Sequence, residues 1–206
     1  MGGLIKYVSK RPDLNKFLGQ AQIAVSETKQ GGTSHNVAGA INVPIVADKL
    51  AVRLSGFNSH DGGYIDDISL DRQEVNRSDT YGGRADLLFS PSDVLSIRVT
   101  GFLQNIDRNG QGTADYLLSG SPETGPLVSR RFVPEPFTQQ YRLASGTVDY
   151  DLGSATLTSI SSYQEVASDI GYDITRQQLS RLINPPFNRS YSAYMEIGRA
   201  SCRERV

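Results

Sequence analysis

Apolar and polar residues alternate along most of the chain with a period of two residues. In LSIRVTGFLQ, residues 95–104, the odd positions carry Leu, Ile, Val, Gly and Leu, whereas the even positions include Arg98 and Gln104. A period of two places successive side chains on opposite faces of a β-strand. No segment keeps a helical period. The pattern therefore predicts an all-β chain, with strands near residues 20–27, 36–46, 50–56, 80–89, 95–104, 140–150 and 155–164, and the start of another in SYSAYM, residues 190–195.

The connections between these strands alternate in length. ADK (47–49), PSD (91–93) and DLGS (151–154) are short polar turns, whereas residues 60–79, 107–137 and about 169–188 form long insertions. Only the first hairpin, through KQGGTS, is short where a long connection is due. Long structureless connections are uncommon in a soluble domain, but transmembrane barrels combine short turns on one rim with long loops on the other. The spacing predicts a continuous antiparallel meander with the three short turns on one rim.

Charged residues lie at the centres of several predicted strands, namely Arg53, Arg84, Asp86 and Arg98. A charge on a lipid face costs about 2 to 4 kcal/mol at the membrane midplane, and a dry core penalises it at least as heavily. A water-filled lumen accommodates such residues. A soluble β-sandwich with these residues on its outer faces fits the same alternation. For a barrel, we expect the three arginines on the concave face and an apolar set on the convex, lipid-facing side: Leu50, Val52, Leu54, Leu95, Ile97, Val99 and Leu103.

The first twelve residues, MGGLIKYVSKRP, contain a more specific signal. From Gly2 to Pro12 they resemble the last plug strand of TonB-dependent outer-membrane receptors, which reads GG-[TLV]-I-x-[YI]-[VI]-[ST]-[KR]-[KR]-P. SDTYGGRADLLFSPSDVLSIRVTGF and YDLGSATLTSISSYQ are similar to paired barrel strands of the same receptors. The resemblance covers residues 1 to about 196. It implies an antiparallel meander forming part of a 22-stranded transmembrane β-barrel.

By this resemblance, residues 1–12 are the C-terminal end of a plug domain. Residues 13–196 are then the N-terminal part of the barrel, with about seven strands and a truncated eighth. We therefore expect the chain to be a fragment, which lacks the signal peptide, the TonB-contacting segment, most of the plug and the later strands. An open sheet leaves unpaired edge groups in lipid, so we expect only the longer product to insert into a membrane.

The resemblance also implies a function, the import of a scarce ligand, foremost a ferric siderophore, across the outer membrane of a Gram-negative bacterium. Its partners are the inner-membrane TonB system, outer-membrane lipid and lipopolysaccharide, with no nucleic acid, cofactor or bound metal and no enzymatic activity. Aromatic and cationic loop residues suit flat, anionic chelates. The candidate ligand contacts are Tyr64, Arg72, Arg108, Tyr116, Arg130, Arg131, Tyr172 and Arg176.

Three alternatives remain open at this stage. In the first, the chain is part of such a receptor, but the ligand is a carbohydrate or another compound without iron. In the second, the chain is a soluble β-sandwich that binds carbohydrate, which predicts an aromatic platform on one sheet face. In the third, the chain belongs to an outer-membrane enzyme of the lipase type, which requires a converging Ser and His pair.

Other motifs offer little chemistry. His35 and His60 lie in separate loops or strand ends without partners that spacing establishes, so we expect exposed, structural roles. Asp66 and Asp67 have the chemistry for a cation, although a solvated loop is the simpler interpretation. DRNGQGTAD, residues 107–115, lacks the glutamate that a calcium loop needs at its twelfth position.

The last ten residues, IGRASCRERV, have a separate explanation. A common sequencing-library adapter, read in the frame that completes a glutamate codon, encodes the same ten residues and then a stop codon. We therefore interpret residues 197–206, which contain the only cysteine, Cys202, as an adapter-derived tail. The alternative is a genuine basic tail that binds nucleic acid or anionic lipid. Three of the 21 basic and one of the 22 acidic residues lie in this tail, which leaves a net charge of about −3 elsewhere. The tail lacks strand period, so we expect it to be disordered or poorly packed.

Overall fold

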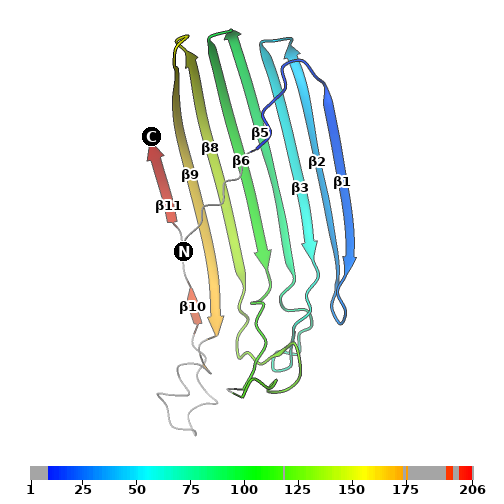
Figure 1. Ribbon diagram of the computed structural model, residues 1–206. Coiled ribbons are helices and arrows are strands. Elements are labelled where there is room, and N and C mark those ends of the chain that lie inside the picture. Colours follow the sequence, from blue (N-terminus) through cyan, green and yellow to red (C-terminus); the bar gives the residue numbers. More distant parts are fainter. Residues whose placement is uncertain (1–8, 118, 174, 176–193, 197–199, 206) are drawn as a thin grey trace.

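The computed structural model describes residues 9–117, 119–173, 175, 194–196 and 200–205, and its architecture is all-β (Figure 1). One nine-stranded antiparallel sheet dominates it, in the order β1-β2-β3-β5-β6-β8-β9-β10, with β11 also paired to β9. Its strands are β1 (Leu18–Glu27), β2 (Thr33–Val46), β3 (Leu50–Asp61), β5 (Ser78–Ser92), β6 (Leu95–Arg108), β8 (Phe137–Asp151), β9 (Thr156–Asp173), β10 (Tyr194–Glu196) and β11 (Ala200–Arg205). The predicted meander is confirmed.

The connections lie as their lengths predicted. The β2–β3, β5–β6 and β8–β9 turns share the upper rim of the sheet in Figure 1. The first two long connections gather at the opposite rim, where the short β1–β2 hairpin also lies. Of the third predicted insertion, about 169–188, residues 169–173 belong to β9, and residues 176–188 lie outside the described residues. Two of the long connections, residues 62–77 and 109–136, form one unit that we call the loop cluster. Within it, β4 (Asp66–Asp67) and β7 (Val128–Ser129) pair in parallel.

Across the central parts of β2, β3, β5 and β6, the strand register sorts side chains onto two faces of opposite character. Val52 lies opposite Leu87, and Leu87 lies opposite Val99, so these residues share one face. Arg53 lies opposite Asp86 on the other face. We call these the apolar face and the polar face. The predicted division is confirmed, since the apolar face carries Leu50, Val52, Leu54, Leu95, Ile97, Val99 and Leu103, and the polar face carries Arg53, Arg84 and Arg98.

The C-terminal residues differ from the expectation. Residues 200–205 form β11, which pairs with β9 from Ala200 opposite Val166 to Arg205 opposite Ser161. The expectation of a disordered tail is therefore wrong for residues 200–205, because their backbone pairs with β9. The reason is that an unpaired strand edge offers backbone N–H and C=O groups to any extended segment, whatever its side chains. The truncated eighth strand appears as β10, whose Met195 lies opposite Tyr172.

The chain before β1 crosses the polar face (Figure 1). Asn42, only 1% exposed at the centre of β2, binds this segment through its whole amide. Its Oδ1 accepts a hydrogen bond from the Asp13 backbone N–H at 2.8 Å, and its Nδ2 donates to the carbonyls of Asp13 and Lys16 at 2.9 and 2.7 Å. Farther along, Arg11 pairs with Asp149 at 3.1 Å. We call residues 9–17 the crossing segment.

Replacing Asn42 with Ala tests this anchor. The change leaves one backbone N–H and two carbonyls without partners. We expect this to destabilise the attachment of the crossing segment to the sheet by about 1–3 kcal/mol, so that the segment detaches more often. Trypsin should then cleave after Lys10 and Lys16 much faster than in the unmodified chain. Asn36→Ala is the matched control, because Asn36 lies on the same face of β2. Equal cleavage of both variants contradicts the anchoring role.

Gly82 permits a close contact on the polar face. A Cβ at this position would lie 2.7 Å from the Leu103 carbonyl oxygen and 2.7 Å from Cε1 of the Phe57 ring. At Gly101, on the apolar face, a Cβ would meet nothing within 4 Å. We expect Gly82→Ala to lower the free energy of unfolding in urea by about 1–3 kcal/mol through overpacking. Gly101→Ala should change it by much less, and similar losses in both variants contradict the explanation.

Candidate functional site

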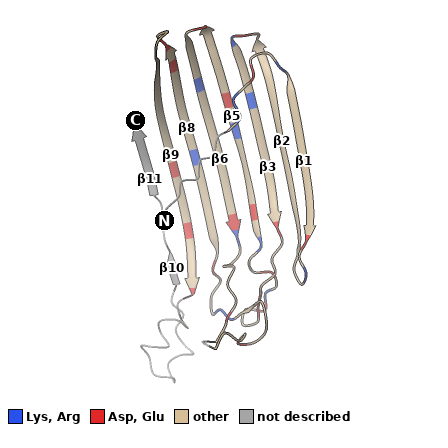
Figure 2. Ribbon diagram, viewed as in Figure 1, with Lys and Arg blue, Asp and Glu red and all other residues tan. Residues whose placement is uncertain are grey.

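A buried charge cluster occupies the centre of the polar face. Asp86 is 2% exposed, and Arg84 binds it through Nε at 2.6 Å. Arg98 binds the same carboxylate through Nη2 at 2.8 Å, and the Thr100 hydroxyl donates to it at 2.6 Å. Arg98 also donates to Ser9 Oγ at 3.1 Å, which ties the cluster to the crossing segment. We call Arg84, Asp86, Arg98 and Thr100 the Asp86 cluster. Figure 2 shows that basic and acidic residues lie within the strands of the sheet as well as in the loops.

A cavity of about 640 Å³ lies beside this cluster, between the crossing segment and the sheet. Its charged lining consists of Lys10, Arg53, Arg84 and Asp86. Small residues on β2 make the space, since Ala38 and Ala40 project from the polar face where longer side chains would fill it. Ligand cavities in proteins commonly measure 300–1,000 Å³. We call this space the polar-face cavity.

The loop cluster is folded around a second buried carboxylate, that of Asp67. Its Oδ1 accepts from the backbone N–H groups of Ser69 and Leu70, both at 2.9 Å. Its Oδ2 accepts from the Ser129 hydroxyl at 3.0 Å and from the Arg131 N–H at 2.8 Å. Asp67 is 2% exposed, so the expectation of a solvated side chain is wrong here. Its carboxylate joins two loops that lie about sixty residues apart in the sequence.

Arg131 holds the 109–136 loop together. Its Nη1 donates to Asp115 Oδ1 and its Nε to Glu135 Oε2, both at 2.8 Å, and its Nη2 donates to Thr113 Oγ1 at 3.0 Å. Burial disfavours the charge of Arg131, but the hydrogen bonds to Asp115 and Glu135 outweigh it and raise the pKa of the guanidinium above its ordinary value. Arg131 therefore keeps its positive charge throughout the pH range in which proteins fold.

The loop cluster is also joined to the end of β9. The Asp173 carboxylate accepts hydrogen bonds from the backbone N–H groups of Phe132 and Val133, while its own backbone N–H donates to Glu135 Oε1 at 2.9 Å. Glu135 thus binds Arg131 with one oxygen and β9 with the other. This connection fixes the loop cluster relative to the sheet.

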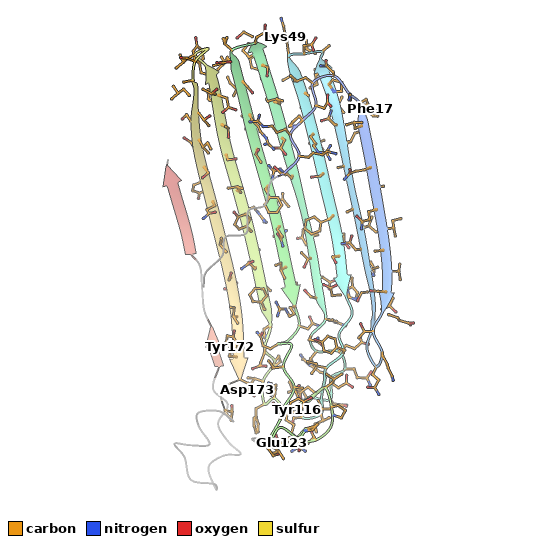
Figure 3. The ribbon with its side chains drawn as sticks, in the orientation of Figure 1. Phe17, Lys49, Tyr116, Glu123, Tyr172 and Asp173 are labelled. Atoms are coloured by element: carbon orange, nitrogen blue, oxygen red, sulfur yellow. The ribbon has the colours of Figure 1, made fainter. Side chains whose placement is uncertain are left out.

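The predicted ligand contacts lie at several separate places at the long-loop rim. Tyr64 and Arg72 are exposed in the first loop. Tyr116 is exposed in the second loop (Figure 3). Arg108 lies at the end of β6, with its guanidinium 4.9 Å from the centre of the Phe137 ring. Arg130 and Arg131 are adjacent, but only Arg131 is occupied by carboxylates, and Tyr172 is part of β9. Arg176 lies outside the described residues. Ligand contact stays a prediction for each of these residues.

Sequence reasoning missed the residues that organise the loops. Asp67, Asp115, Glu135 and Asp173 each bind a residue at least sixteen positions away, which no local pattern encodes. One signal was present, because Asp residues such as those in DDISL are typical of turns in which the side chain binds backbone N–H groups a few residues ahead.

The two histidines also lie closer together than the sequence suggested. His35 and His60 are opposite one another in the register of β2 and β3, with ring centroids 5.1 Å apart. Nδ1 of His60 lies 2.6 Å from Asp79 Oδ1. Within the described residues, no group of three or more His, Cys, Asp or Glu side chains has the geometry to hold a metal ion. In the same part of the chain, no helix has the length and apolar character needed to span a membrane.

Comparison with protein families, with curated proteins and with solved structures finds no match for this chain. The similarity of residues 2–12 to the plug strand of TonB-dependent receptors therefore remains a hypothesis based on the sequence. The fold and the two sites described above carry the functional argument.

Arg131→Ala tests the folding of the loop cluster. The change leaves the carboxylates of Asp115 and Glu135 without their cation, and breaking a buried pair in this way costs about 3 kcal/mol. We expect faster amide hydrogen exchange in residues 65–67 and 128–131, with the central strands unaffected. Arg130→Ala is the matched control, because the Arg130 contacts shown are those of its backbone. Unchanged exchange in Arg131→Ala contradicts its role.

Proposed function

We propose that this chain forms part of the wall of a TonB-dependent outer-membrane transporter, with the crossing segment continuing from the end of its plug. The transporter imports a scarce ligand, a ferric siderophore by our hypothesis, using energy delivered by the TonB system. The observation that carries the proposal is the apolar face, which no other part of the described chain covers. Val99 at its centre is 51% exposed, and Ile23 near its edge is 74% exposed.

The dimensions of this face fit a bilayer. On β6 the apolar residues run from Leu95 to Leu103, a distance of eight residue steps, or roughly 26 Å at about 3.3 Å per step. The outward apolar band of a transmembrane barrel is about 25 Å tall. A soluble sandwich would bury such a face against a second sheet, whereas the other sheet of the described chain is only the β4–β7 pair.

The apolar band also crosses the strands obliquely. Toward the long loops, its last large residue is Val25 on β1 but Tyr163 on β9. The register carries Val25 to the level of Asp107 on β6 and Tyr163 to the level of Gly101. This offset of six residues is roughly 20 Å along the strands. Six strand spacings separate β1 from β9, a total of roughly 29 Å across the sheet, so the edge of the band is inclined by about 35° to the direction perpendicular to the strands. Strands of transmembrane barrels tilt by about 35–45°.

The polar face supports the second half of the proposal. Its charges need water or partners, as they would have in a lumen closed by a plug. Ser9 and Asp13 of the crossing segment already bind this face through Arg98 and Asn42. The resemblance of residues 2–12 to a plug strand predicts the same placement. The loop cluster supplies a folded surface on the rim where such transporters first meet their ligands.

The absence of tryptophan from the sequence permits a direct test of the membrane face. We expect Val99→Trp, made in the chain purified in detergent, to emit at short wavelength and to be quenched by a detergent brominated on its alkyl chain. Ser145→Trp is the control, because Ser145 lies opposite Thr100 and so belongs to the polar face. It should be quenched much less.

Two results oppose the proposal. If neither tryptophan is quenched and the chain stays in solution without detergent, the soluble sandwich is the better interpretation. If the membrane face is confirmed but deletion of the intact gene leaves uptake of ferric chelates unchanged, the chain belongs to another kind of outer-membrane barrel, such as a carbohydrate receptor.

A further inference from the structure

The polar-face cavity has an excess of positive charge. Lys10, Arg53 and Arg84 face a single lining carboxylate, that of Asp86. That carboxylate is already bound by Arg84, Arg98 and Thr100. Among the described residues, neither Lys10 nor Arg53 forms an ion pair with a carboxylate. The lining of the cavity therefore has more positive than negative side chains, and an anionic ligand would balance them.

Arg53 is the residue with the strongest requirement for a counter-ion. It lies in the middle of β3, directly opposite Asp86 across the β3–β5 pairing, and its side chain is only partly exposed. A cation so placed is destabilising unless an anion or water compensates it. A guanidinium also has five donors in a planar fork, which matches the oxygens of carboxylate, sulfonate or phosphate groups.

The remaining lining describes the body of the ligand. Phe57 and Phe102 supply flat apolar surface, while Gln20 and Gln22 on β1 supply neutral hydrogen-bonding groups. The volume of about 640 Å³ admits a molecule with several fused or linked rings. Cations near aromatic side chains suit a flat anion better than an uncharged sugar.

We propose that the polar-face cavity binds a multivalent organic anion with a flat apolar body, held by Arg53 and Lys10 with Arg84 as the third cation. The site lies on the polar face of the sheet beside Ser9 and Lys10 of the crossing segment, apart from the loop residues predicted as ligand contacts. It deepens the proposed transport function by naming the ligand chemistry, but the binding itself is measured without transport.

The test uses the full chain in a non-ionic detergent, with β-sheet content checked by circular dichroism. The probe is 8-hydroxypyrene-1,3,6-trisulfonate, a flat fluorescent trianion, and its binding is followed by anisotropy against a blank of micelles alone. We expect saturable binding that weakens as salt rises, that excess pyrophosphate displaces, and that an uncharged disaccharide leaves unchanged.

Arg53→Gln and Lys10→Gln should each weaken probe binding about tenfold or more, as expected for the loss of one charge-assisted contact. Neither residue forms an ion pair in the described structure, so the fold should survive both changes. Lys29→Gln, in the exposed β1–β2 turn, removes the same unit of charge and should leave binding unchanged.

Three outcomes overturn the site: no saturable binding to a chain with full β-sheet content, equal weakening by Lys29→Gln, or displacement by the disaccharide. Each is distinct from failure of the proposed function. If detergent quenches Val99→Trp but the chain binds no anion, the proposed membrane role stands and the anion site is wrong. If the chain is soluble and binds the trianion, the anion site stands and the proposed membrane role is wrong.

Discussion

The strand register is the constraint on which the rest of the structure depends. Every residue of β2, β3, β5 and β6 belongs to one of two faces with opposite requirements, and a slip of one residue would exchange them. It would move Asp86 into the apolar row of Leu87 and would break the contacts with Arg84, Arg98 and Thr100. The buried carboxylate and the apolar rows thus select the same alignment.

The crossing segment adds a second restraint on the same face. Asn42 satisfies three backbone groups of a segment that has no secondary structure of its own, and Arg98 reaches Ser9. Since this segment covers only part of the polar face, the cavity beside Arg53 is a consequence of the arrangement. Ala38 and Ala40 on β2 leave room for the cavity, and Arg53, which has no carboxylate partner among the described residues, gives it a positive charge.

The sheet was predictable from the sequence because its information is local. Alternation fixed the faces of Leu95 to Leu103, and polar turns such as ADK fixed the sides on which strands meet. The loop cluster was not predictable, because Asp67 and Arg131 gain their roles only when two distant loops meet. β11 shows the opposite limit, where backbone pairing at an open edge orders a segment that lacks a strand pattern. Side-chain periodicity therefore predicts which strand fits a sheet, but not every segment that attaches to it.

The neighbour-by-neighbour pairing of the large strands has a consequence for the order in which the chain organises. From β1 to β9, no strand has to wait for a distant segment, and isolated hairpins form within microseconds. Pairing between strands that are adjacent in the sequence favours growth of the sheet by one hairpin after another. At each step the last strand of the sheet exposes unpaired backbone N–H and C=O groups, like those of β9 that pair with β11. We therefore expect such a chain to require a chaperone, because an exposed strand edge can pair with the wrong segment before the correct strand reaches it.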